Sequence, residues 1–399
     1  MERNEKKKNK TDKTKNFVED HGYFFERHEV TTEDGYILQV QRLLKRDNSS
    51  PIDASDNGKG LEITDTLEQP QPRRPAVLLV HGLLCRGESW CATENSLPNI
   101  LLEKGYDCWL PSLRGTSGSR KHVELASNSK KYWDFSFHEM GVFDMPAITD
   151  YVLNITGNTN LSYIGHSMGC SVFCIFLSMH PEYCSKINVC VALAPSFYGK
   201  YIRSLLLKST FPVGNYLGRS KYFRERPICK WTAYQCLRYL VPKSKKDRVA
   251  GWLIRISGEI MDINGGKGIE KKTYRTLSTE LPNSTSMKLY CHGVQCFWTD
   301  KFRMYDYGKS KNEKIYGQSK PPEYQRGNIL APVATFSSTG DHLCPPPDVK
   351  RLSDELPNLI GYNCIEDEKF SHVDFVAGKN APVLLYDSII KTIAEYTSK

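Results

Sequence analysis

The sequence predicts an α/β fold in which a mostly parallel sheet is covered by helices. Short apolar runs recur along the chain, and segments with the 3.6-residue spacing of amphipathic helices lie between them. Parallel strands need helical crossovers, so this alternation favours a parallel sheet. The expected strands lie at 76–80, 108–110, 161–164, 189–194, 332–336 and 359–365, and the helical patterns at 139–153 and 169–179.

The alternation is interrupted once, which predicts an insertion. Between about residues 200 and 310, basic clusters and scattered aromatic residues replace the strand runs. We therefore expect a core formed by residues 16–199 and 311–399, with a mainly helical cap inserted at 200–310. An earlier run at 36–43 alternates loosely and predicts a further strand, followed by a polar loop at 46–75.

Composition and charge are those of a globular protein with a basic beginning. The chain has 399 residues, of which 40% are hydrophobic, and its net charge is +9. Residues 1–15 alone carry +4 without an apolar core, which predicts a disordered, solvated tail rather than a nucleic-acid or anionic-membrane tether. A second basic cluster at 221–248 fits either an anionic interface or solvated helix faces. Since no apolar run reaches 18 residues, we expect no transmembrane helix.

Signals for cellular location are weak. No apolar segment follows the basic N-terminus, so no signal peptide is visible. The 13 cysteines form neither a zinc-site spacing nor a dense disulfide framework. Glycosylation sequons occur at five positions, which matter only if the chain enters the secretory route: Asn9, Asn48, Asn154, Asn160 and Asn283.

The pentad 165–169, Gly-His-Ser-Met-Gly, is the strongest chemical signal in the chain. It follows the strand expected at 161–164 and precedes an apolar helix, which is the setting of a nucleophile elbow in an α/β-hydrolase. Glycines are needed there because the serine sits on a tight, strained turn. We expect Ser167 to be a nucleophile, although a glycine-flanked helix N-terminus capped by serine is the plain structural alternative.

A base and an acid follow in the order that this fold requires. The strand expected at 332–336 leads into a loop that ends at Asp341, and His372 follows the next strand. We expect Asp341 to orient His372, which would exchange a proton with Ser167. Three rivals stay open. His342 adjoins Asp341 and is expected to be a spectator, while Asp348 or Asp374 would replace Asp341.

An oxyanion hole needs backbone N–H donors. One is expected from Met168, the residue after the nucleophile. The other is expected from Leu83, in the loop 81–84 that follows the strand at 76–80. The alternative is that His81-Gly82 merely ends a strand. No phosphate-binding loop or metal-ligand pair is found in the sequence, so we expect no metal or organic cofactor.

From about His21 onward the sequence resembles the acid lipase family of animals, the gastric and lysosomal lipases. The longest match is 133–141, Trp-Asp-Phe-Ser-Phe-His-Glu-Met-Gly. Further matches lie at 23–28, 32–38, 81–84, 114–115, 144–147, 305–308, 341–349 and 372–375, and at Ser286, His292 and Gln295. The chain departs from the family pattern at Met168 and Thr116, and residues 243–285 match poorly.

The resemblance implies a serine hydrolase that cleaves triacylglycerols or steryl esters at a lipid–water interface. It places the same triad on Ser167, Asp341 and His372, and a cap disulfide near Cys229 and Cys236. It also implies a secreted or lysosomal glycoprotein, whereas the missing signal peptide leaves a cytoplasmic or lipid-droplet location open. A carboxylesterase for smaller soluble esters, or a non-catalytic lipid-binding protein of the same fold, is the alternative.

Overall fold

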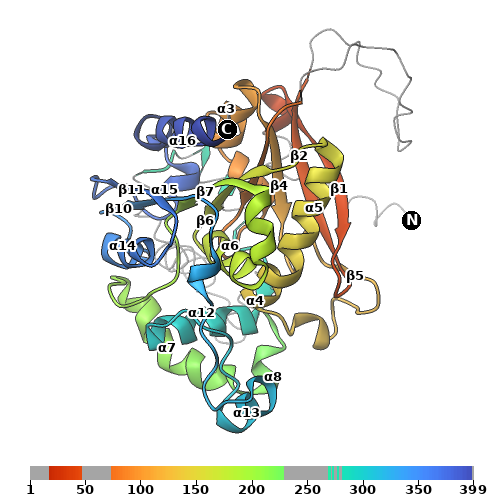
Figure 1. The fold of residues 1–399 in the computed structure, drawn as a ribbon, viewed down its shortest axis with the longest axis vertical. Coiled ribbons are helices and arrows are strands. Elements are labelled where there is room, and N and C mark those ends of the chain that lie inside the picture. Colours follow the sequence, from red (N-terminus) through yellow and green to blue (C-terminus); the bar gives the residue numbers. More distant parts are fainter. Residues whose placement is uncertain are drawn as a thin grey trace, which may run out of the picture.

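A nine-stranded sheet forms the centre of the protein (Figure 1). The computed structural model describes residues 18–46, 73–228 and 281–397, together with 268–270, 272–273 and 276–277. The strand order is β1-β2-β4-β3-β6-β7-β10-β11, and β5 pairs with β2. The strands are β1 Tyr23–Thr31, β2 Tyr36–Lys45, β3 Ala76–Val80, β4 Asp107–Ser112, β5 Lys121–His122, β6 Leu161–His166, β7 Ile187–Leu193, β10 Val333–Ser338 and β11 Leu359–Ile365.

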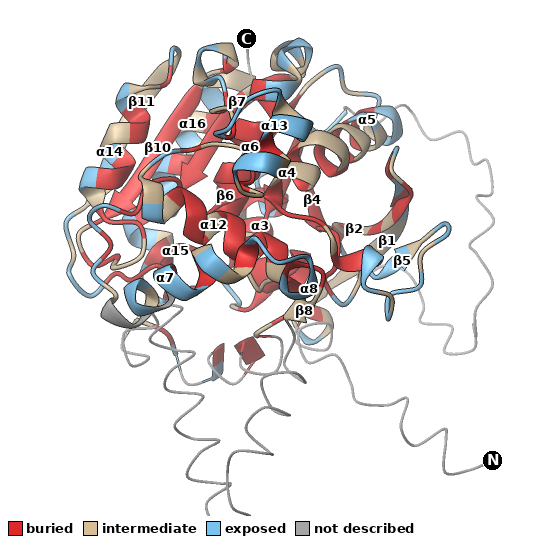
Figure 2. Cartoon of the chain, turned by 90° about the horizontal axis from the view of Figure 1, so that it is seen from below, coloured by how far each residue is buried: buried red, intermediate tan, exposed pale blue. Residues whose placement is uncertain are grey.

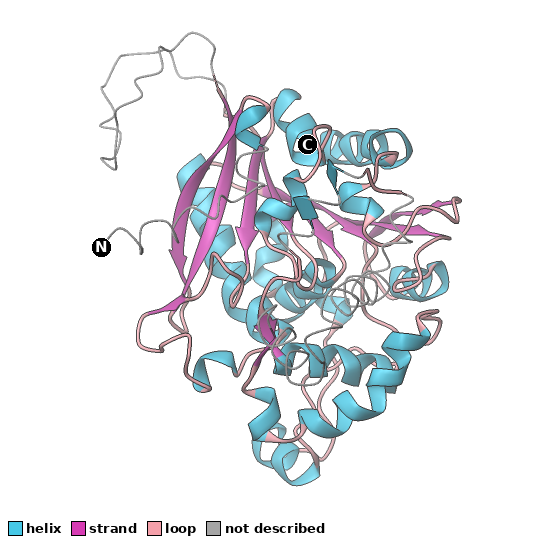
Figure 3. Cartoon of the chain, turned by 180° about the vertical axis from the view of Figure 1, so that it is seen from behind, coloured by secondary structure: helices cyan, strands magenta, loops and turns pink. Residues whose placement is uncertain are grey.

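The six strands from β4 to β11 in this order are parallel, and β1 and β2 join them antiparallel. The predicted mostly parallel sheet is therefore confirmed. Figure 3 shows the strands from behind, with helices on either side of them. The helices of the core are α3 Leu97–Glu103, α4 Phe137–Glu139, α5 Met145–Thr156, α6 Met168–Met179, α14 Pro346–Asp354, α15 Asp374–Ala377 and α16 Asp387–Thr397.

Strand β3 shows why the central strands are apolar throughout. Its alternate residues belong to two separate cores: Ala76, Leu78 and Val80 pack with α5 and α6, whereas Val77 and Leu79 pack with α3 and α16. Side chains of a strand point to opposite faces in turn, and both faces of a parallel sheet are buried. Figure 2 shows the resulting band of buried strands through the middle of the protein.

Two elements differ from the sequence-based expectation. Strand β1 was not expected as a strand, because its sequence mixes polar and apolar residues. It lies at the sheet edge with most of its side chains half-buried or exposed, so the apolar alternation is weak. The helix expected at 139–153 is interrupted: a π-helical turn, Met140–Asp144, connects α4 to α5.

The described part of the insertion between β7 and β10 is mainly helical. It contains α7 Leu205–Gly218, α8 Lys221–Arg224, β8 Pro227–Ile228, β9 Thr285–Ser286, α12 Met287–Thr299 and α13 Lys309–Tyr316. Figure 1 shows α7, α8 and α13 at the end of the long axis opposite α16. No helix within the described ranges has the length and apolar composition needed to cross a bilayer.

The exact cap boundaries at 200 and 310 stay a prediction. Several further expectations fall outside the residues that the structure describes. These are the basic tail at 1–15, nearly all of the polar loop at 46–75, the sequons at Asn9 and Asn48, and the pair Cys229 and Cys236.

Candidate active site

Ser167 occupies a strained turn between a strand and a helix. It follows β6 directly and precedes α6, and its backbone has φ 54° and ψ −115°. Few residues other than glycine adopt a positive φ, and such strain concentrates at functional sites. The turn is held in place because the Ser167 N–H donates to the Leu193 carbonyl of β7 at 2.9 Å.

The two glycines of the pentad are required by close backbone contacts. A Cβ atom at Gly169 would lie 2.4 Å from the Val80 carbonyl oxygen of β3. At Gly165 it would lie 3.0 Å from the Cys170 nitrogen and from the Gly169 carbonyl carbon. Any side chain at either position would push α6 away from the sheet, so both glycines allow the elbow to form.

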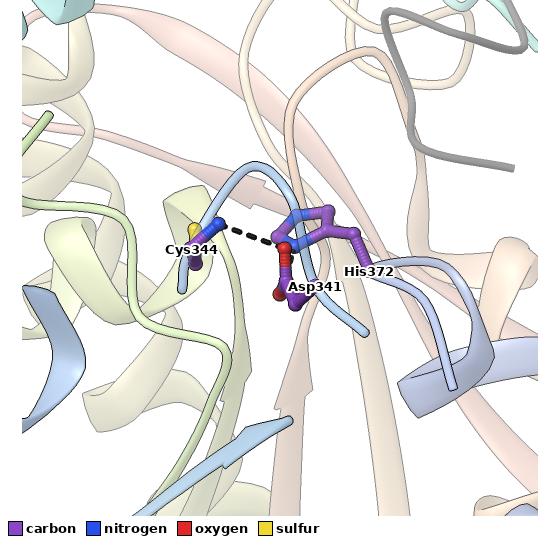
Figure 4. A group of neighbouring side chains, drawn as sticks. All are labelled: Asp341, Cys344 and His372. Carbon is purple, nitrogen blue, oxygen red and sulfur yellow. Dashed lines mark hydrogen bonds and ion pairs between the residues drawn. The ribbon is translucent and has the colours of Figure 1, made fainter. Parts of the chain in front are cut away.

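Asp341 and His372 are brought together at the carboxyl ends of β10 and β11. His372 Nδ1 lies 2.8 Å from Asp341 Oδ2, and both side chains are buried. Figure 4 shows these two residues together with Cys344. The other carboxylate oxygen, Oδ1, accepts the backbone N–H groups of Leu343 and Cys344, each at 2.8 Å.

These contacts determine the charge of Asp341. Burial alone would raise the pKa of this carboxyl group, but His372 and the two N–H donors outweigh burial and lower the pKa below its ordinary value. Asp341 is therefore a carboxylate at neutral and mildly acidic pH. A charged, fully hydrogen-bonded acid at Nδ1 holds the His372 ring in one orientation and one tautomer.

The three rival residues make other contacts. The Asp348 carboxylate accepts the backbone N–H of Tyr201 at 3.0 Å. Asp374 Oδ2 accepts the Ser371 N–H at 2.7 Å and the Ser371 hydroxyl at 2.6 Å, so it braces the turn that carries His372. The His342 carbonyl accepts the Arg203 N–H at 2.9 Å. Asp341 is thus the acid that the structure places on His372 Nδ1.

The loop 81–85 lies against the elbow. A Cβ atom at Gly82 would meet the Ser167 Cβ at 3.3 Å, which shows how closely the two backbones approach. Leu83 and Met168, the two expected N–H donors, both line the cavity that contains Ser167. Both residues therefore border the same cavity as Ser167, and their role as oxyanion donors stays a prediction.

His81 holds this loop through a contact that the sequence did not indicate. Its Nδ1 donates to the Gly82 carbonyl at 2.8 Å, and its Nε2 accepts the Leu113 N–H at 3.1 Å. Burial lowers the pKa of His81 to about 4, consistent with this neutral tautomer. The Gly82 carbonyl and the Leu83 N–H belong to one planar peptide, so His81 also orients the Leu83 N–H.

His166 links the elbow to the loop of His372. Its Nε2 donates to the His372 carbonyl at 3.0 Å, and the two rings lie 4.8 Å apart. Burial lowers the pKa of His166 to about 3. The sequence offered no signal for the roles of His81 and His166 beyond their positions in motifs. The His166 bond joins segments that only the fold brings together, and the His81 bond sets the direction of a single peptide.

Ser167 and His372 open into a cavity of about 180 Å³ that is almost entirely apolar. The insertion contributes lining side chains from α7 and α12, and the loops that follow the core strands contribute others. The apolar residues of the lining include Leu83, Leu207, Leu277, Leu281, Leu289, Val294, Phe297, Phe302, Leu343, Val373 and Val376. An apolar cavity beside a serine suits an acyl chain better than a polar group.

Helix α12 is anchored to the core by a buried lysine that pairs with two half-buried acids. Lys288 is only 3% exposed, and its Nζ lies 2.8 Å from Glu139 Oε1 and 3.3 Å from Asp134 Oδ1. His292, one turn further along α12, packs its ring flat on Phe137 at 4.0 Å and places Nδ1 3.0 Å from the Ser136 hydroxyl. The segment 133–141 thus provides the contacts that hold α12 over the cavity.

A second junction joins the cap to the loop after β3. The Asn283 N–H donates to the Leu84 carbonyl at 2.7 Å, and the Asn283 side-chain amide contacts the Ser117 N–H and hydroxyl at 2.9 and 3.1 Å. Because this amide is buried and occupied at both atoms, a glycan on Asn283 is incompatible with the folded chain. The sequon at Asn154, on α5, is exposed.

Asp341, Cys344 and His372 offer possible ligand atoms that all lie within 4.8 Å of one another. Both Asp341 oxygens, however, already accept hydrogen bonds. Burial also raises the pKa of the Cys344 thiol well above its ordinary value, so its sulfur keeps its proton. The geometry therefore suits proton transfer rather than metal binding.

Similar proteins identify the family. The profile described as "Partial alpha/beta-hydrolase lipase region" matches residues 14–94, and that described as "alpha/beta hydrolase fold" matches residues 75–204. "Lipase 3" of Drosophila melanogaster is 32% identical over 95% of this chain and 92% of its own length. "Gastric triacylglycerol lipase" of Homo sapiens is 31% identical over 94% of this chain and 89% of its own length.

A lysosomal relative and a solved structure agree with this. The "Putative lysosomal acid lipase/cholesteryl ester hydrolase" of Crotalus adamanteus is 32% identical over 93% of this chain and 87% of its own length. An esterase from Exiguobacterium antarcticum superposes with a TM-score of 0.51 over 92% of this chain and all of its own, at 12% identity, which supports the fold alone. This chain therefore belongs to the acid lipase family of α/β-hydrolases and is a carboxylic ester hydrolase.

Proposed function

We propose that the protein is a serine lipase that cleaves carboxylic esters of lipids through an acyl-enzyme intermediate. Ser167 Oγ attacks the ester carbonyl while His372 takes the serine proton and returns it to the leaving alcohol. The alcohol departs and leaves an acyl-serine ester. Water, deprotonated by His372, then attacks that ester, releases the fatty acid and restores Ser167. Asp341 keeps the imidazole in the required tautomer and stabilises its positive charge.

The negative charge on the ester oxygen needs donors that are already in place. In this proposal the N–H groups of Leu83 and Met168 supply them, one from each side of Ser167. Donors set before the reaction cost no reorganisation, and each is worth roughly 3–4 kcal/mol in the transition state. His81 contributes by holding the Gly82 carbonyl, which directs the Leu83 N–H.

One observation supports this proposal most directly. Ser167, which is strained, and His372 line one apolar cavity, and Asp341 holds His372 from behind at 2.8 Å, although the three come from separate parts of the sequence. A non-catalytic lipid-binding protein would gain nothing from a strained serine or a buried acid–base pair, since both cost stability.

The cavity also supports a lipid substrate. Its walls are leucine, valine and phenylalanine side chains, and burying each CH₂ of an acyl chain among them contributes about 0.8 kcal/mol. Relatives named for triacylglycerol and cholesteryl esters point to the same class. We propose a triacylglycerol or steryl ester as substrate, met at a lipid–water interface, with no metal or organic cofactor required.

Covalent labelling with a fluorophosphonate tests the nucleophile. The wild-type protein should label, and the Ser167→Ala variant should not. Ser171→Ala is the matched control, because Ser171 lines the same cavity but donates its hydroxyl to the Ser196 carbonyl. Equal labelling of wild type and Ser167→Ala would refute the assignment, and loss of labelling in the control alone would transfer it to Ser171.

Hydrolysis of three substrates tests the lipid class. Emulsified long-chain triacylglycerol, cholesteryl ester and a short soluble ester should be compared by kcat/KM. We expect the long-chain esters to be preferred. A preference of more than about a hundredfold for the soluble ester, roughly 2.7 kcal/mol, would instead make the protein a carboxylesterase.

The relatives named for stomach and lysosome support a secreted or lysosomal location. In that case the exposed Asn154 is the favoured glycosylation site among the described sequons, and Asn283 is not used. Mass spectrometry of the protein from its natural cells, before and after enzymatic removal of N-glycans, checks this. A mass that does not change would favour the cytoplasmic or lipid-droplet alternative.

A further inference from the structure

One side of the cap combines exposed aromatic residues with positive charge. Helix α7 turns Phe211, Gly214 and Gly218 inward, and the two glycines let it approach Val294 and Cys291 of α12. The opposite side of α7 leaves Val213 57% and Tyr216 77% exposed. We call this side, with its continuation on α8, the α7–α8 face; it consists of Lys208, Val213, Tyr216, Arg219, Lys221, Tyr222 and Phe223.

Its charge is strongly one-sided. Residues 200–228 contain a single acidic residue, Glu225, which is buried and lies 3.7 Å from Lys221. The basic residues of this stretch are Lys200, Arg203, Lys208, Arg219, Lys221, Arg224 and Arg226. Among the described residues, Lys208 makes no ion pair, and the Arg219 contact to Asp306 is long at 3.4 Å. The face therefore keeps a net positive charge.

Cations and an aromatic ring are also placed beside one another. Tyr222 is 60% exposed, and its ring centroid lies 4.3 Å from the Arg226 guanidinium carbon and 5.4 Å from Lys130 Nζ. Aromatic rings settle at the headgroup level of a lipid layer, and neighbouring Lys and Arg side chains bind the negative charges there.

This face is connected to the candidate site. Leu207, six residues before the exposed Val213 on α7, lines the cavity of Ser167. On the inner side, Phe211 packs against Phe297 of α12 at 5.9 Å, and Phe297 lines the same cavity. The inner side of α7 therefore reaches the cavity, while its outer side forms the exposed α7–α8 face.

We propose that the α7–α8 face docks the enzyme on anionic lipid surfaces, with Tyr216, Tyr222 and Phe223 inserted among headgroups and the cations bound to their negative charges. The purpose of this docking rests on the proposed lipid substrate, but the binding itself requires no catalytic turnover. Each Lys or Arg near an anionic surface contributes about 1 kcal/mol of binding free energy. Salt screens this attraction, which falls off within a Debye length.

Vesicle co-sedimentation of the full chain tests the proposal. Vesicles of phosphatidylcholine with phosphatidylserine should bind the protein at least about tenfold better than phosphatidylcholine alone, and rising salt should remove the difference. The variant Lys208→Ser/Lys221→Ser should lose about 30-fold in affinity for the anionic vesicles, the equivalent of about 2 kcal/mol. The variant Tyr216→Ser/Tyr222→Ser should bind both vesicles more weakly and keep the anionic preference.

A matched control separates docking from net charge. Lys104→Ser/Lys391→Ser removes two exposed lysines near α3 and on α16, at the opposite end of the long axis (Figure 1), and should bind as wild type does. Equal binding of neutral and anionic vesicles, or equal losses in both lysine variants, overturns the proposal. If the protein still labels with fluorophosphonate in that case, docking fails while the proposed function stands. If Ser167→Ala labels like wild type but the protein still binds anionic vesicles selectively, the docking proposal stands and the proposed function fails.

Discussion

His166 donates its Nε2–H to the backbone carbonyl of His372 at 3.0 Å. The residue that precedes the candidate nucleophile therefore holds the loop that carries the candidate base. Ser167 and His372 are 205 positions apart in the sequence, so their relative placement cannot come from local structure. This single bond, between the elbow and the loop after β11, ties the two together.

Removing this bond should slow the chemical step. In His166→Phe we expect kcat to fall about 5- to 30-fold, the effect of losing one hydrogen bond worth about 1–2 kcal/mol, with KM almost unchanged. His166→Gln keeps a side-chain N–H donor and should recover part of the loss. Steady-state kinetics on a soluble ester checks this. An equal loss in both variants would mean that packing, not the hydrogen bond, matters.

His81 should act on the oxyanion rather than on the base. In His81→Phe the Gly82 carbonyl loses its donor, so the Leu83 N–H is no longer directed, and we expect kcat to fall about 10- to 100-fold. The fall should be matched by weaker inhibition by a boronic acid, which mimics the charged intermediate. Unchanged boronic acid affinity would contradict this role. The pH dependence of kcat/KM should keep its midpoint, because His372 is untouched.

Asp341→Asn should have the largest effect among the orienting residues. The amide does not supply a negative charge and favours the wrong His372 tautomer, so kcat should fall on the order of 10⁴-fold. Because the pKa of Asp341 lies below its ordinary value, this carboxylate stays charged through mildly acidic pH. The acidic limb of the wild-type pH–rate profile should therefore report His372. Asp348→Asn, which changes a nearby acid bound to the Tyr201 N–H, is the control and should retain most activity.

Three buried histidines should make the fold less stable in acid. Burial lowers the pKa of His81 to about 4, and of His166 and His292 to about 3. These groups stay neutral in the folded state while the unfolded chain binds their protons below about pH 6.5, so the free energy of unfolding should fall as pH decreases from 6.5 towards 4.

Denaturant unfolding at several pH values measures this slope. Each such histidine contributes up to about 1.4 kcal/mol per pH unit in that window. In His292→Gln the number of protons taken up on unfolding, which sets this slope, should decrease by close to one, whatever the change in stability at pH 7. A variant with the wild-type slope would show that His292 is not neutral in the folded protein.

Lys288 should be the main electrostatic anchor of the cap. In Lys288→Met the half-buried Glu139 loses its buried counter-charge, and we expect the free energy of unfolding to fall by about 3 kcal/mol. The double variant Lys288→Met/Glu139→Gln removes both charges and should recover much of that loss. Urea unfolding of the two variants checks this. Lys301→Met, which breaks the exposed pair with Glu323, is the control and should cost less than about 1 kcal/mol.

The sequence was informative where a property is local. Apolar runs revealed β3, β4, β6, β7 and β10, because a strand buried on both faces must be apolar along its length. The run at 359–365 also revealed β11, although this strand lies at the other edge of the sheet and is mostly half-buried. Strand β1 was missed because an edge strand needs no such pattern. The pentad 165–169 located the elbow, since a tight turn permits few residue types at its glycines.

What the sequence by itself determined is the parallel sheet, the position of the strained serine, and the chain order in which an acid and a base follow it. Only the tertiary structure decided that Asp341, rather than Asp348 or Asp374, meets His372 Nδ1, and that His81 and His166 hold the loops around Ser167. The same is true of Lys288, whose burial against Glu139 places α12 over the cavity. The reason is physical: a strand, a turn or a helix follows from neighbouring residues. A hydrogen bond or buried ion pair between distant segments depends on where the whole chain brings its atoms.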